Sequence, residues 1–599
     1  MSEAADTYLL LRAFVQELAR CGLRAACTSP GSRCTPIVLS LARCSPLSCY
    51  SHIDERCSGF FALGLAKASG LPVAITCTSG TAVAELYPAV IEAHQARVPL
   101  IVLSADRPPE LRENGAGQTI DQIQIFGGAA KWFFEVGTHD ASPQRLRWIR
   151  TLACRAYWTA LEGRPGVVHL NFPLREPLVL EQPLPDDHSA RPDGQPYVTR
   201  PAPSTSSARQ TAQLGELVAG SRRGVVVAGR HERSPRLARV LSEFCARVSW
   251  PLLADPLSGA RRGAGAVAHY DALLRQPRFA GSQRPDLVIR VGDLPTSKPL
   301  RAWLSDLAGT PQVALDPQAA WQDPDSVLTH SFALDPADVL PVLESPTHTQ
   351  DDWLSRWRAA DQLAAQAILR ALEHDQLSEP LLASELGVLL ASEATLFVAS
   401  SMPVRDIESF WPIREDPPRV LCNRGANGID GTVSSAFGAA ASGNGPVLLL
   451  IGDVALAHDI GGLLAAGRLG LELTIVLIDN GGGGIFDFLS VASEQMALEQ
   501  DHYSTHIATP TGLEFARAAE LYGLAHESVN DLPGLRSALE RALGRPGCQI
   551  IQVKTERGHN VALHHRLWRA VGEAIAGQDP GAPAPRAPDS GAAGEQHHG

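Results

Sequence analysis

Short runs of apolar residues recur along the chain, and most of them are bounded by Gly, Pro or Asp. Examples are residues 71–77 (LPVAITC), 224–229 (GVVVAG), 447–453 (VLLLIGD) and 473–480 (LTIVLIDN). Their β-branched content and their lack of strict alternation predict strands that are buried on both faces of a parallel sheet. Segments with helical spacing lie between them. This alternation of strand and helix is typical of doubly wound α/β domains.

Two stretches rich in Pro, Ser and Asp divide the chain, one at residues 180–208 and one at residues 334–352. They predict three α/β domains, over residues 1–185, 209–345 and 353–577. The first and third domains share the same rhythm of strands and helices, which suggests a duplication. A tail over residues 578–599 is rich in Gly and Pro and is expected to be disordered, because it cannot supply a core.

The composition is that of an ordinary globular protein. The 599 residues are 45% hydrophobic and 19% charged, with a formal net charge of −12. Such an acidic chain is not expected to bind nucleic acid. No apolar run has the length of a membrane span, and the N-terminal segment has the pattern of an amphipathic helix, not of a signal peptide. The 11 cysteines contain no CxxC pair, so we expect a cytoplasmic protein.

Acidic and amide side chains stand at the ends of two consecutive strands in the third domain. Gly452 and Asp453 end one strand, and Asp479 and Asn480 end the next, followed by four glycines. Open α/β sheets bind ligands at the carboxyl ends of their strands. A carboxylate, an amide oxygen and a backbone carbonyl form an oxygen set suited to Mg²⁺, with positions left for a diphosphate. A Gly-Asp pair alone is more often a simple turn, but its partner one crossover later favours the metal–diphosphate site.

These strand ends resemble the signature of the thiamine-diphosphate-dependent enzymes, in which a GD is followed one crossover later by NN. The chain departs from it at Val454, where many members have Gly, and at Asp479, which replaces the first Asn. The resemblance implies three domains of the decarboxylase and synthase type, with thiamine diphosphate and Mg²⁺ (or Mn²⁺) as cofactors. By family position the metal ligands are Asp453, Asn480 and the Gly482 carbonyl, and further cofactor contacts are Ile429, Gly452 and Val454. For Ile429, an ordinary packed side chain is the open alternative.

Residues 51–80 (SHIDERCSG to TCTSG) resemble the half of the same family that binds the pyrimidine ring of the cofactor. Enzymes of this class activate the cofactor with a carboxylate that is hydrogen-bonded to this ring in a pocket of low dielectric. Glu55 is the residue at that position, although a lone carboxylate at a helix start more often only interacts with the helix dipole. Because the pyrimidine half is the first domain and the diphosphate half the third, the resemblance implies a site between two chains, in a homodimer or homotetramer.

Ten segments, among them residues 28–36 (TSPGSRCTP) and 423–431 (NRGANGIDG), resemble a branch of this family that acts in menaquinone biosynthesis. The resemblance implies decarboxylation of 2-oxoglutarate and addition of the succinyl unit to isochorismate. Both substrates are dicarboxylates, so an acidic protein that binds them needs local cations. The implied ligands of 2-oxoglutarate are Ser401, Arg405 and Arg424. The implied ligands of isochorismate are Ser32, Arg33, Arg107, Gln118 and Lys298, with Ile485, Phe486 and Leu489 as an apolar wall.

Several alternatives stay open at the level of the sequence. A lone Arg is more often a solvated surface residue than a ligand, and Pro299 stands where some relatives have a second basic residue beside Lys298. An acetolactate-synthase-like or 2-oxo-acid decarboxylase activity would use the same cofactor, but it would not need cations from several loops. A non-catalytic homologue that keeps the fold is a further possibility, although it would be expected to have lost Glu55, Asp453 or Asn480, and all three are present. The central domain lacks an intact GxGxxG and is not expected to bind a dinucleotide.

Overall fold

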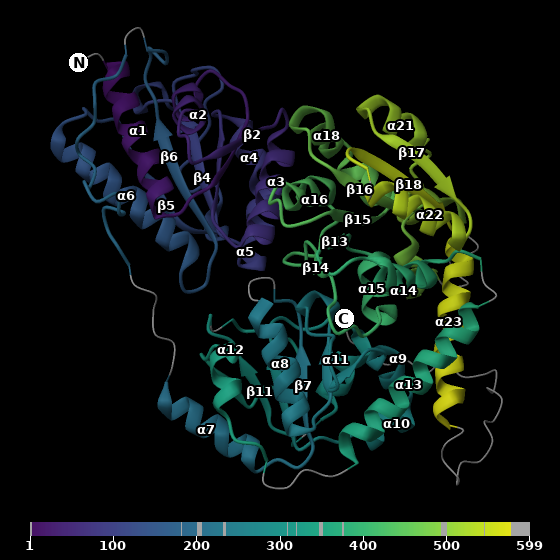
Figure 1. The fold of residues 1–599 in the computed structure, drawn as a ribbon. Coiled ribbons are helices and arrows are strands. Elements are labelled where there is room, and N and C mark those ends of the chain that lie inside the picture. Colours follow the sequence, from purple (N-terminus) through teal and green to yellow (C-terminus); the bar gives the residue numbers. More distant parts are fainter. Residues whose placement is uncertain are drawn as a thin grey trace.

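The computed structural model describes residues 3–180, 183–200, 207–231, 235–307, 309–318, 320–346, 352–373, 376–492, 500–543 and 545–576. Three sheets, each of six strands, form three α/β domains (Figure 1). Neighbouring strands pair in parallel, which confirms the predicted fold class. The predicted tail at residues 578–599 lies outside the described residues. Within them, no helix is both long and apolar enough to span a bilayer.

The first domain has the strand order β2-β1-β3-β4-β6-β5. Its elements are α1 (Glu3–Cys21), β1 (Ala25–Thr28), α2 (Thr35–Ala42), β2 (Ser48–Ser51), α3 (Glu55–Ser69), β3 (Val73–Cys77), α4 (Thr81–Glu85), α5 (Tyr87–Ala96), β4 (Leu100–Asp106), the 3-10 turns η1 (Pro109–Leu111) and η2 (Gly127–Ala129), β5 (Ala130–Glu135), α6 (Pro143–Leu161) and β6 (Val167–Pro173). Every residue of β3, β4 and β6 is buried, as their apolar runs predict. The order reverses between β1 and β3, and such a switch point opens a crevice at the carboxyl ends of the two strands.

The third domain has the order β14-β13-β15-β16-β18-β17, which by position in the chain is the same order as in the first domain. Its elements are α13 (Trp353–Leu372), α14 (Glu379–Leu389), β13 (Thr395–Val398), α15 (Met402–Phe410), β14 (Arg419–Leu421), α16 (Thr432–Ala440), β15 (Val447–Gly452), α17 (Asp453–His458), η5 (Ile460–Leu463), α18 (Leu464–Leu469), β16 (Leu473–Asp479), η6 (Gly484–Phe488), η7 (Ser490–Ala492), α20 (Gln500–Tyr503), the π-helical turn η8 (Ser504–Ala508), α21 (Phe515–Tyr522), β17 (Ala525–Val529), α22 (Leu532–Leu543), β18 (Cys548–Lys554) and α23 (Arg557–Ala576). The shared rhythm seen in the sequence is therefore a shared topology. Its switch point lies between β13 and β15.

The central domain has a different order, β12-β11-β10-β7-β8-β9, which is that of dinucleotide-binding folds. Its elements are α7 (Ala208–Ala219), β7 (Gly224–Ala228), α8 (Pro235–Val248), β8 (Leu252–Ala254), η3 (Pro256–Ser258), β9 (Ala266–Val267), α9 (Tyr270–Leu274), α10 (Pro277–Ser282), β10 (Leu287–Val291), α11 (Lys298–Ser305), β11 (Gln312–Leu315), β12 (His330–Phe332), α12 (Pro336–Val339) and η4 (Leu340–Val342). Beyond β7 and β10, Arg230 pairs with Asp293. Asp293 also pairs with Arg97 of the first domain, and Arg97 reaches Asp316 at 3.0 Å. The crevice at the switch point of this domain is thus part of the contact with the first domain.

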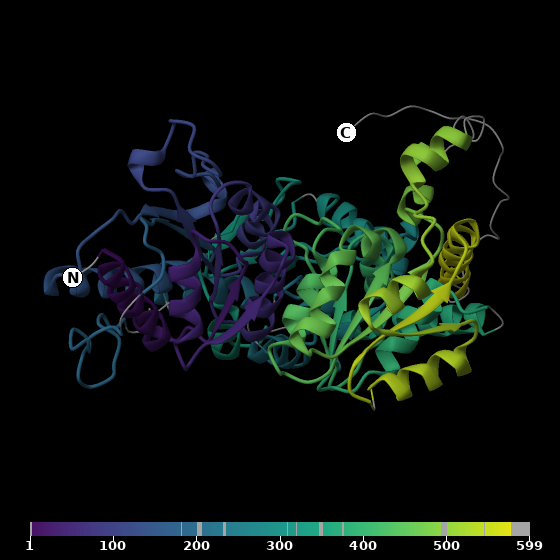
Figure 2. The ribbon, with the colours of Figure 1, turned by 90° about the horizontal axis from the view of Figure 1, so that it is seen from above.

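The first and third domains are joined by α3 and α16, which pack side by side at very short range (Figures 1 and 2). A Cβ atom on Gly64 would lie 1.9 Å from the Ser435 carbonyl oxygen, and one on Gly438 would lie 2.0 Å from the Phe61 carbonyl oxygen. Only glycine allows the two helix backbones to approach so closely. This contact fixes how the two domains face each other within one chain.

Candidate active site

A cavity of about 370 Å³ lies at the switch point of the third domain. Its walls come from the loops that follow β13, β14, β15 and β16 and from the start of α14. The structure brings together here the predicted residues Ser401, Arg405, Arg424, Ile429, Gly452, Asp453, Val454, Asn480, Gly482, Ile485 and Phe486. The cavity also contains Glu379, Ser400 and Asn427, which the sequence patterns did not single out.

One group of residues in this cavity presents oxygen atoms. Asp453 begins α17 directly after β15 and is 2% exposed. Its carboxylate accepts hydrogen bonds from the backbone N–H groups of Val454 and Gly482, both at 2.8 Å, and the bond from Gly482 ties the glycine loop to the end of β15. Burial raises the pKa of Asp453 to about 6. A bound cation would offset this cost of burying a carboxylate.

Asn480 and Gly482 are the other two predicted oxygen ligands, and both line this cavity. The side-chain Nδ2 of Asn480 donates to Glu379, whereas its Oδ1 is buried without a hydrogen-bond partner among the described residues. Gly482 has φ +131°, and a Cβ there would lie 2.5 Å from the Ala508 carbonyl oxygen, so only glycine fits. A buried, unpaired amide oxygen beside a buried carboxylate fits Mg²⁺, which prefers oxygen ligands.

A second group of residues that line the cavity is cationic. Ser401 precedes α15 with φ 75°, an uncommon value for a residue other than glycine, and Arg405 donates to its carbonyl oxygen at 2.5 Å. Burial, together with the neighbouring Arg424, lowers the pKa of Arg405. Two guanidinium groups that face one partly buried cavity favour an anion between them, and a carboxylate matches their geometry.

The first domain holds a second cluster at its own switch point. Arg107, which follows β4, donates to the Ser79 hydroxyl, and Gln118 donates to the Ser79 carbonyl oxygen at 3.1 Å. Arg33 follows β1 and donates to the Leu174 carbonyl oxygen at 2.8 Å. Burial and the nearby Arg33 lower the pKa of Arg107. The structure therefore brings Arg33, Arg107 and Gln118 to one edge of the sheet, and the exposed Ser32 adjoins them.

Ser79 was missed as a candidate, although its TSGT segment could have indicated it. This segment is the turn between β3 and α4, and a strand end at a switch point is where ligand contacts are expected. Ser79 is fully buried and connects Arg107 and Gln118.

Glu55 is the first residue of α3, and Asp54 caps this helix by accepting from the Arg56 backbone N–H at 2.8 Å. Burial raises the pKa of Glu55. Within one chain Glu55 does not line the cavity that contains Asp453. The two halves of the predicted site are therefore separate in the single chain.

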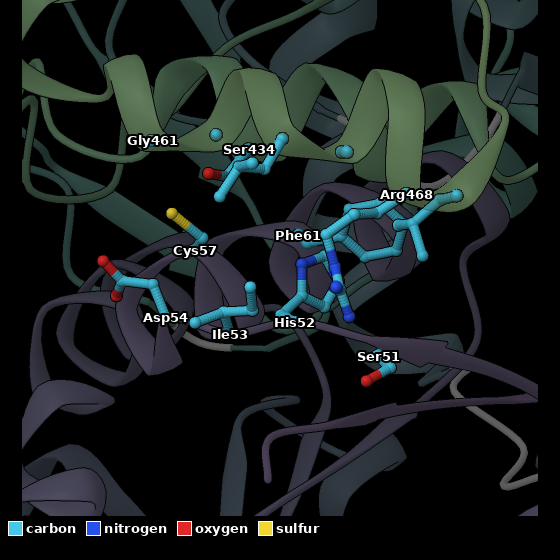
Figure 3. Close-up of a pocket in the computed structure, with 13 residues that line it drawn as sticks. Ser51, His52, Ile53, Asp54, Cys57, Phe61, Ser434, Gly461 and Arg468 are labelled. Carbon is cyan, nitrogen blue, oxygen red and sulfur yellow. The ribbon is translucent and has the colours of Figure 1, made fainter. Parts of the chain in front are cut away.

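A small pocket lies beside the start of α3 (Figure 3). Its lining includes Ser51, His52, Ile53, Asp54, Cys57 and Phe61 of the first domain and Ser434, Gly461 and Arg468 of the third. Burial lowers the pKa of His52 to about 4, so this imidazole is neutral near pH 7. The pocket has a volume of about 20 Å³, which is room for about one water molecule. It is part of the contact between the two domains and contains none of the predicted site residues.

Besides the cluster of the first domain, two further predicted substrate ligands do not line the cavity of the third domain. Lys298 is the exposed first residue of α11 in the central domain. Leu489 follows η6 and is 41% exposed. Neither side chain lines the cavity in one chain, so their roles stay predictions.

Three sequence-family models match the chain and together cover most of it. They describe a thiamine pyrophosphate enzyme N-terminal TPP binding domain at residues 10–125, a middle domain of thiamine pyrophosphate at residues 191–398 and a C-terminal TPP binding domain at residues 403–553. The chain therefore belongs to the thiamine pyrophosphate enzymes.

Its relatives include several proteins named 2-succinyl-5-enolpyruvyl-6-hydroxy-3-cyclohexene-1-carboxylate synthase. The one from Chloroflexus aurantiacus is 42% identical, over 94% of this chain and 96% of the relative. Those from Geobacillus kaustophilus and Listeria innocua are 41% and 39% identical, over 96% and 95% of this chain and 99% and 98% of the relatives. Similarity of this extent places the chain in the family of these synthases.

Proposed function

We propose that this enzyme is a 2-succinyl-5-enolpyruvyl-6-hydroxy-3-cyclohexene-1-carboxylate synthase that acts in menaquinone biosynthesis. It would decarboxylate 2-oxoglutarate and join the remaining four-carbon unit to isochorismate, so that CO₂ is the only other product. The observation that carries the proposal is that one cavity of the third domain contains both kinds of group that the reaction needs. Asp453, Asn480 and Gly482 line it together with Arg405 and Arg424.

The two groups of residues would have separate roles. Asp453, Asn480 and the Gly482 carbonyl would hold Mg²⁺ and, through it, the diphosphate of the cofactor. Thiamine diphosphate, when bound, supplies the nucleophilic carbon and takes up the electron pair that is left when CO₂ departs. Arg405 and Arg424 would hold the distal carboxylate of 2-oxoglutarate, with Ser401 beside them. Ile485 and Phe486 exclude water from the reacting groups.

Isochorismate would be held by the cluster of the first domain. Arg33 and Arg107 supply positive charge, and Gln118 supplies an amide that can donate and accept. Lys298 would contribute from the central domain. We propose that the protein works as a homodimer or homotetramer in which this cluster and Glu55 of one copy face the cavity of another.

Two features support a site shared between copies. Glu55 does not line the described cavity that contains Asp453 in one chain, and the close packing of α3 on α16 prevents a large rotation of one domain against the other. Mixing a Glu55→Gln variant with an Asp453→Ala variant tests the proposal, because a mixed dimer regains one intact site. Activity should return on subunit exchange, whereas a mixture that stays inactive after exchange would contradict a shared site.

The reaction itself is tested by incubating the protein with 2-oxoglutarate, isochorismate, thiamine diphosphate and Mg²⁺. Isochorismate should disappear in step with CO₂ release, and mass spectrometry should identify the product. Pyruvate in place of 2-oxoglutarate is the matched control for an acetolactate-type activity. Turnover of pyruvate without consumption of isochorismate would refute the proposed function. We expect the reaction in the cytoplasm, because the 11 cysteines are free thiols, as is usual in a reducing compartment.

A further inference from the structure

Glu379 is a buried carboxylate in the wall of the cavity, and no sequence motif identifies this residue. It is the first residue of α14 and is 1% exposed. Its Oε1 accepts hydrogen bonds from Asn480 Nδ2 and from the Thr555 hydroxyl, both at 3.0 Å. Its other oxygen has no hydrogen-bond partner among the described residues. The start of α14 and the ends of β16 and β18 therefore meet at one carboxylate.

This position is unfavourable for a carboxylate. Burial removes Glu379 from water, and Asp406 places a second acidic group nearby. Two donors do not satisfy a buried acid that has one oxygen unpaired. A purely structural role would be filled more easily by an apolar side chain of similar size.

The hydrogen bond to Glu379 determines which way the Asn480 amide points. Because Nδ2 faces the carboxylate, Oδ1 must face the opposite way, and there it is buried without a partner. In the flipped orientation, Oδ1 would oppose a carboxylate oxygen and the NH₂ group would face the metal site. An NH₂ group cannot coordinate Mg²⁺, so only the orientation that Glu379 selects is useful for metal binding.

The adjoining glycine loop leaves room for the amide nitrogen of Asn480 in the orientation that Glu379 selects. A Cβ on Gly484 would lie 2.9 Å from Asn480 Nδ2, which is closer than side-chain carbons normally approach. The space around the amide nitrogen is therefore limited by Glu379 on one side and by Gly484 on another.

We infer that Glu379 is a positioning residue that fixes the Asn480 amide with its oxygen toward the metal. Since Asn480 is a metal ligand only under the function proposed above, the inference rests on that function. It adds a residue that acts through Asn480 and does not itself touch the ion. Carboxylates that orient metal ligands in this way typically change metal affinity by about 10- to 100-fold when they are removed.

Two substitutions at Glu379 separate positioning from folding. Glu379→Leu fills the space but cannot accept a hydrogen bond, and it should weaken Mg²⁺-dependent binding of thiamine diphosphate by about 10- to 100-fold. Glu379→Gln keeps an acceptor oxygen and should bind close to the wild-type level. Glu385→Leu is the matched control, because Glu385 lies on the same helix and pairs with Arg536 on the surface. Isothermal calorimetry with and without Mg²⁺ measures the affinity, and thermal unfolding without cofactor measures stability.

A third variant disturbs the same hydrogen bond from the other side. Gly484→Ala leaves the buried acid in place and should also weaken Mg²⁺-dependent binding, which keeps the inference testable if Glu379→Leu does not fold. Wild-type affinity in Glu379→Leu, or an equal loss in Glu379→Gln and Glu379→Leu, would overturn the positioning role alone. A wild-type protein that binds no thiamine diphosphate would overturn the proposed function and this inference together.

Discussion

Replacing Asp453 by Asn tests the proposed metal site with the smallest change in shape. The two carboxylate oxygens accept hydrogen bonds from Val454 N–H and Gly482 N–H, each at 2.8 Å. Asn has only one acceptor oxygen, so its NH₂ group must face one of these two donors. The substitution therefore removes the charge of the proposed metal ligand and leaves either Val454 N–H or Gly482 N–H without an acceptor on this side chain.

The expected loss of affinity follows from these two effects. A hydrogen bond to a charged group contributes about 1.5–3 kcal/mol, which corresponds to roughly a 10- to 150-fold change in affinity. The loss of the charged ligand adds to this value. We expect Mg²⁺-dependent binding of thiamine diphosphate to weaken by at least about 100-fold, or about 2.7 kcal/mol.

Stability without metal should change in the other direction. Burial raises the pKa of Asp453 from its ordinary value of 3.8 to about 6. The carboxyl group thus stabilises the fold only when protonated, and this contribution is lost as the pH rises through about 6. Asp453→Asn stays neutral at every pH, so at pH 8 the metal-free variant should be at least as stable as the wild type. In the wild type, Mg²⁺ affinity should fall below pH 6, because a proton competes with the ion.

Calorimetry with saturating Mg²⁺ and with a chelator measures the affinity, and scanning fluorimetry of the metal-free protein measures stability. Wild-type, Mg²⁺-dependent affinity in Asp453→Asn would refute the assignment of the ligand. A large drop in the melting temperature of the metal-free variant would instead show that Asp453 mainly holds the fold.

Three further predictions concern other parts of the site. Glu55→Gln should still bind thiamine diphosphate, but proton exchange at the reactive thiazolium carbon, followed by NMR, should slow by orders of magnitude; a wild-type exchange rate would argue against its role. Arg405→Ala should raise the KM for 2-oxoglutarate and slow CO₂ release in the absence of isochorismate. Arg107→Ala should leave that release unchanged but raise the KM for isochorismate, and each substitution should cost about 2–5 kcal/mol of binding free energy. The reverse pattern would mean that the two substrate sites are assigned the wrong way round. Burial raises the pKa of Asp459 from 3.8 to about 7, so the stability that its protonated form contributes is lost as the pH rises to 7. The melting temperature of Asp459→Asn, relative to that of the wild type, should therefore increase between pH 5 and pH 8. A difference between the two melting temperatures that does not change with pH would disprove this prediction.

The fold and the third-domain cavity could be predicted because their signals are local in the sequence. The runs that form β4 and β16 are almost entirely buried, so their apolar character reflects the two covered faces of a parallel sheet. Asp453 and Asn480 each follow a buried strand, and parallel strands bring such ends to one edge. The order of the strands had no local signal, so the shared topology of the first and third domains became visible only in the structure.

The residues that orient these side chains could not be predicted in the same way. Glu379 contacts an amide 101 positions away, and a Glu at a helix start is most simply explained by the helix dipole. Glu92, in the first domain, accepts from the backbone N–H groups of Gly425 and Ala426 at 2.8 and 2.6 Å, and so holds the loop of Arg424. Such contacts depend on how the domains pack, which no short motif encodes.

The ion pairs between the first and central domains restrict where Lys298 can lie. Asp293, the partner of Arg97, lies on the loop that runs from β10 to α11, and Lys298 is the first residue of α11. This loop is held against the first domain by the Arg97–Asp293 ion pair, five positions before Lys298. The ion pair therefore fixes the distance between Lys298 and the first domain. Buried ion pairs are screened by salt much less than exposed ones. The distance from Lys298 to the cluster of the first domain should accordingly stay constant as the ionic strength is raised to a level that weakens exposed ion pairs.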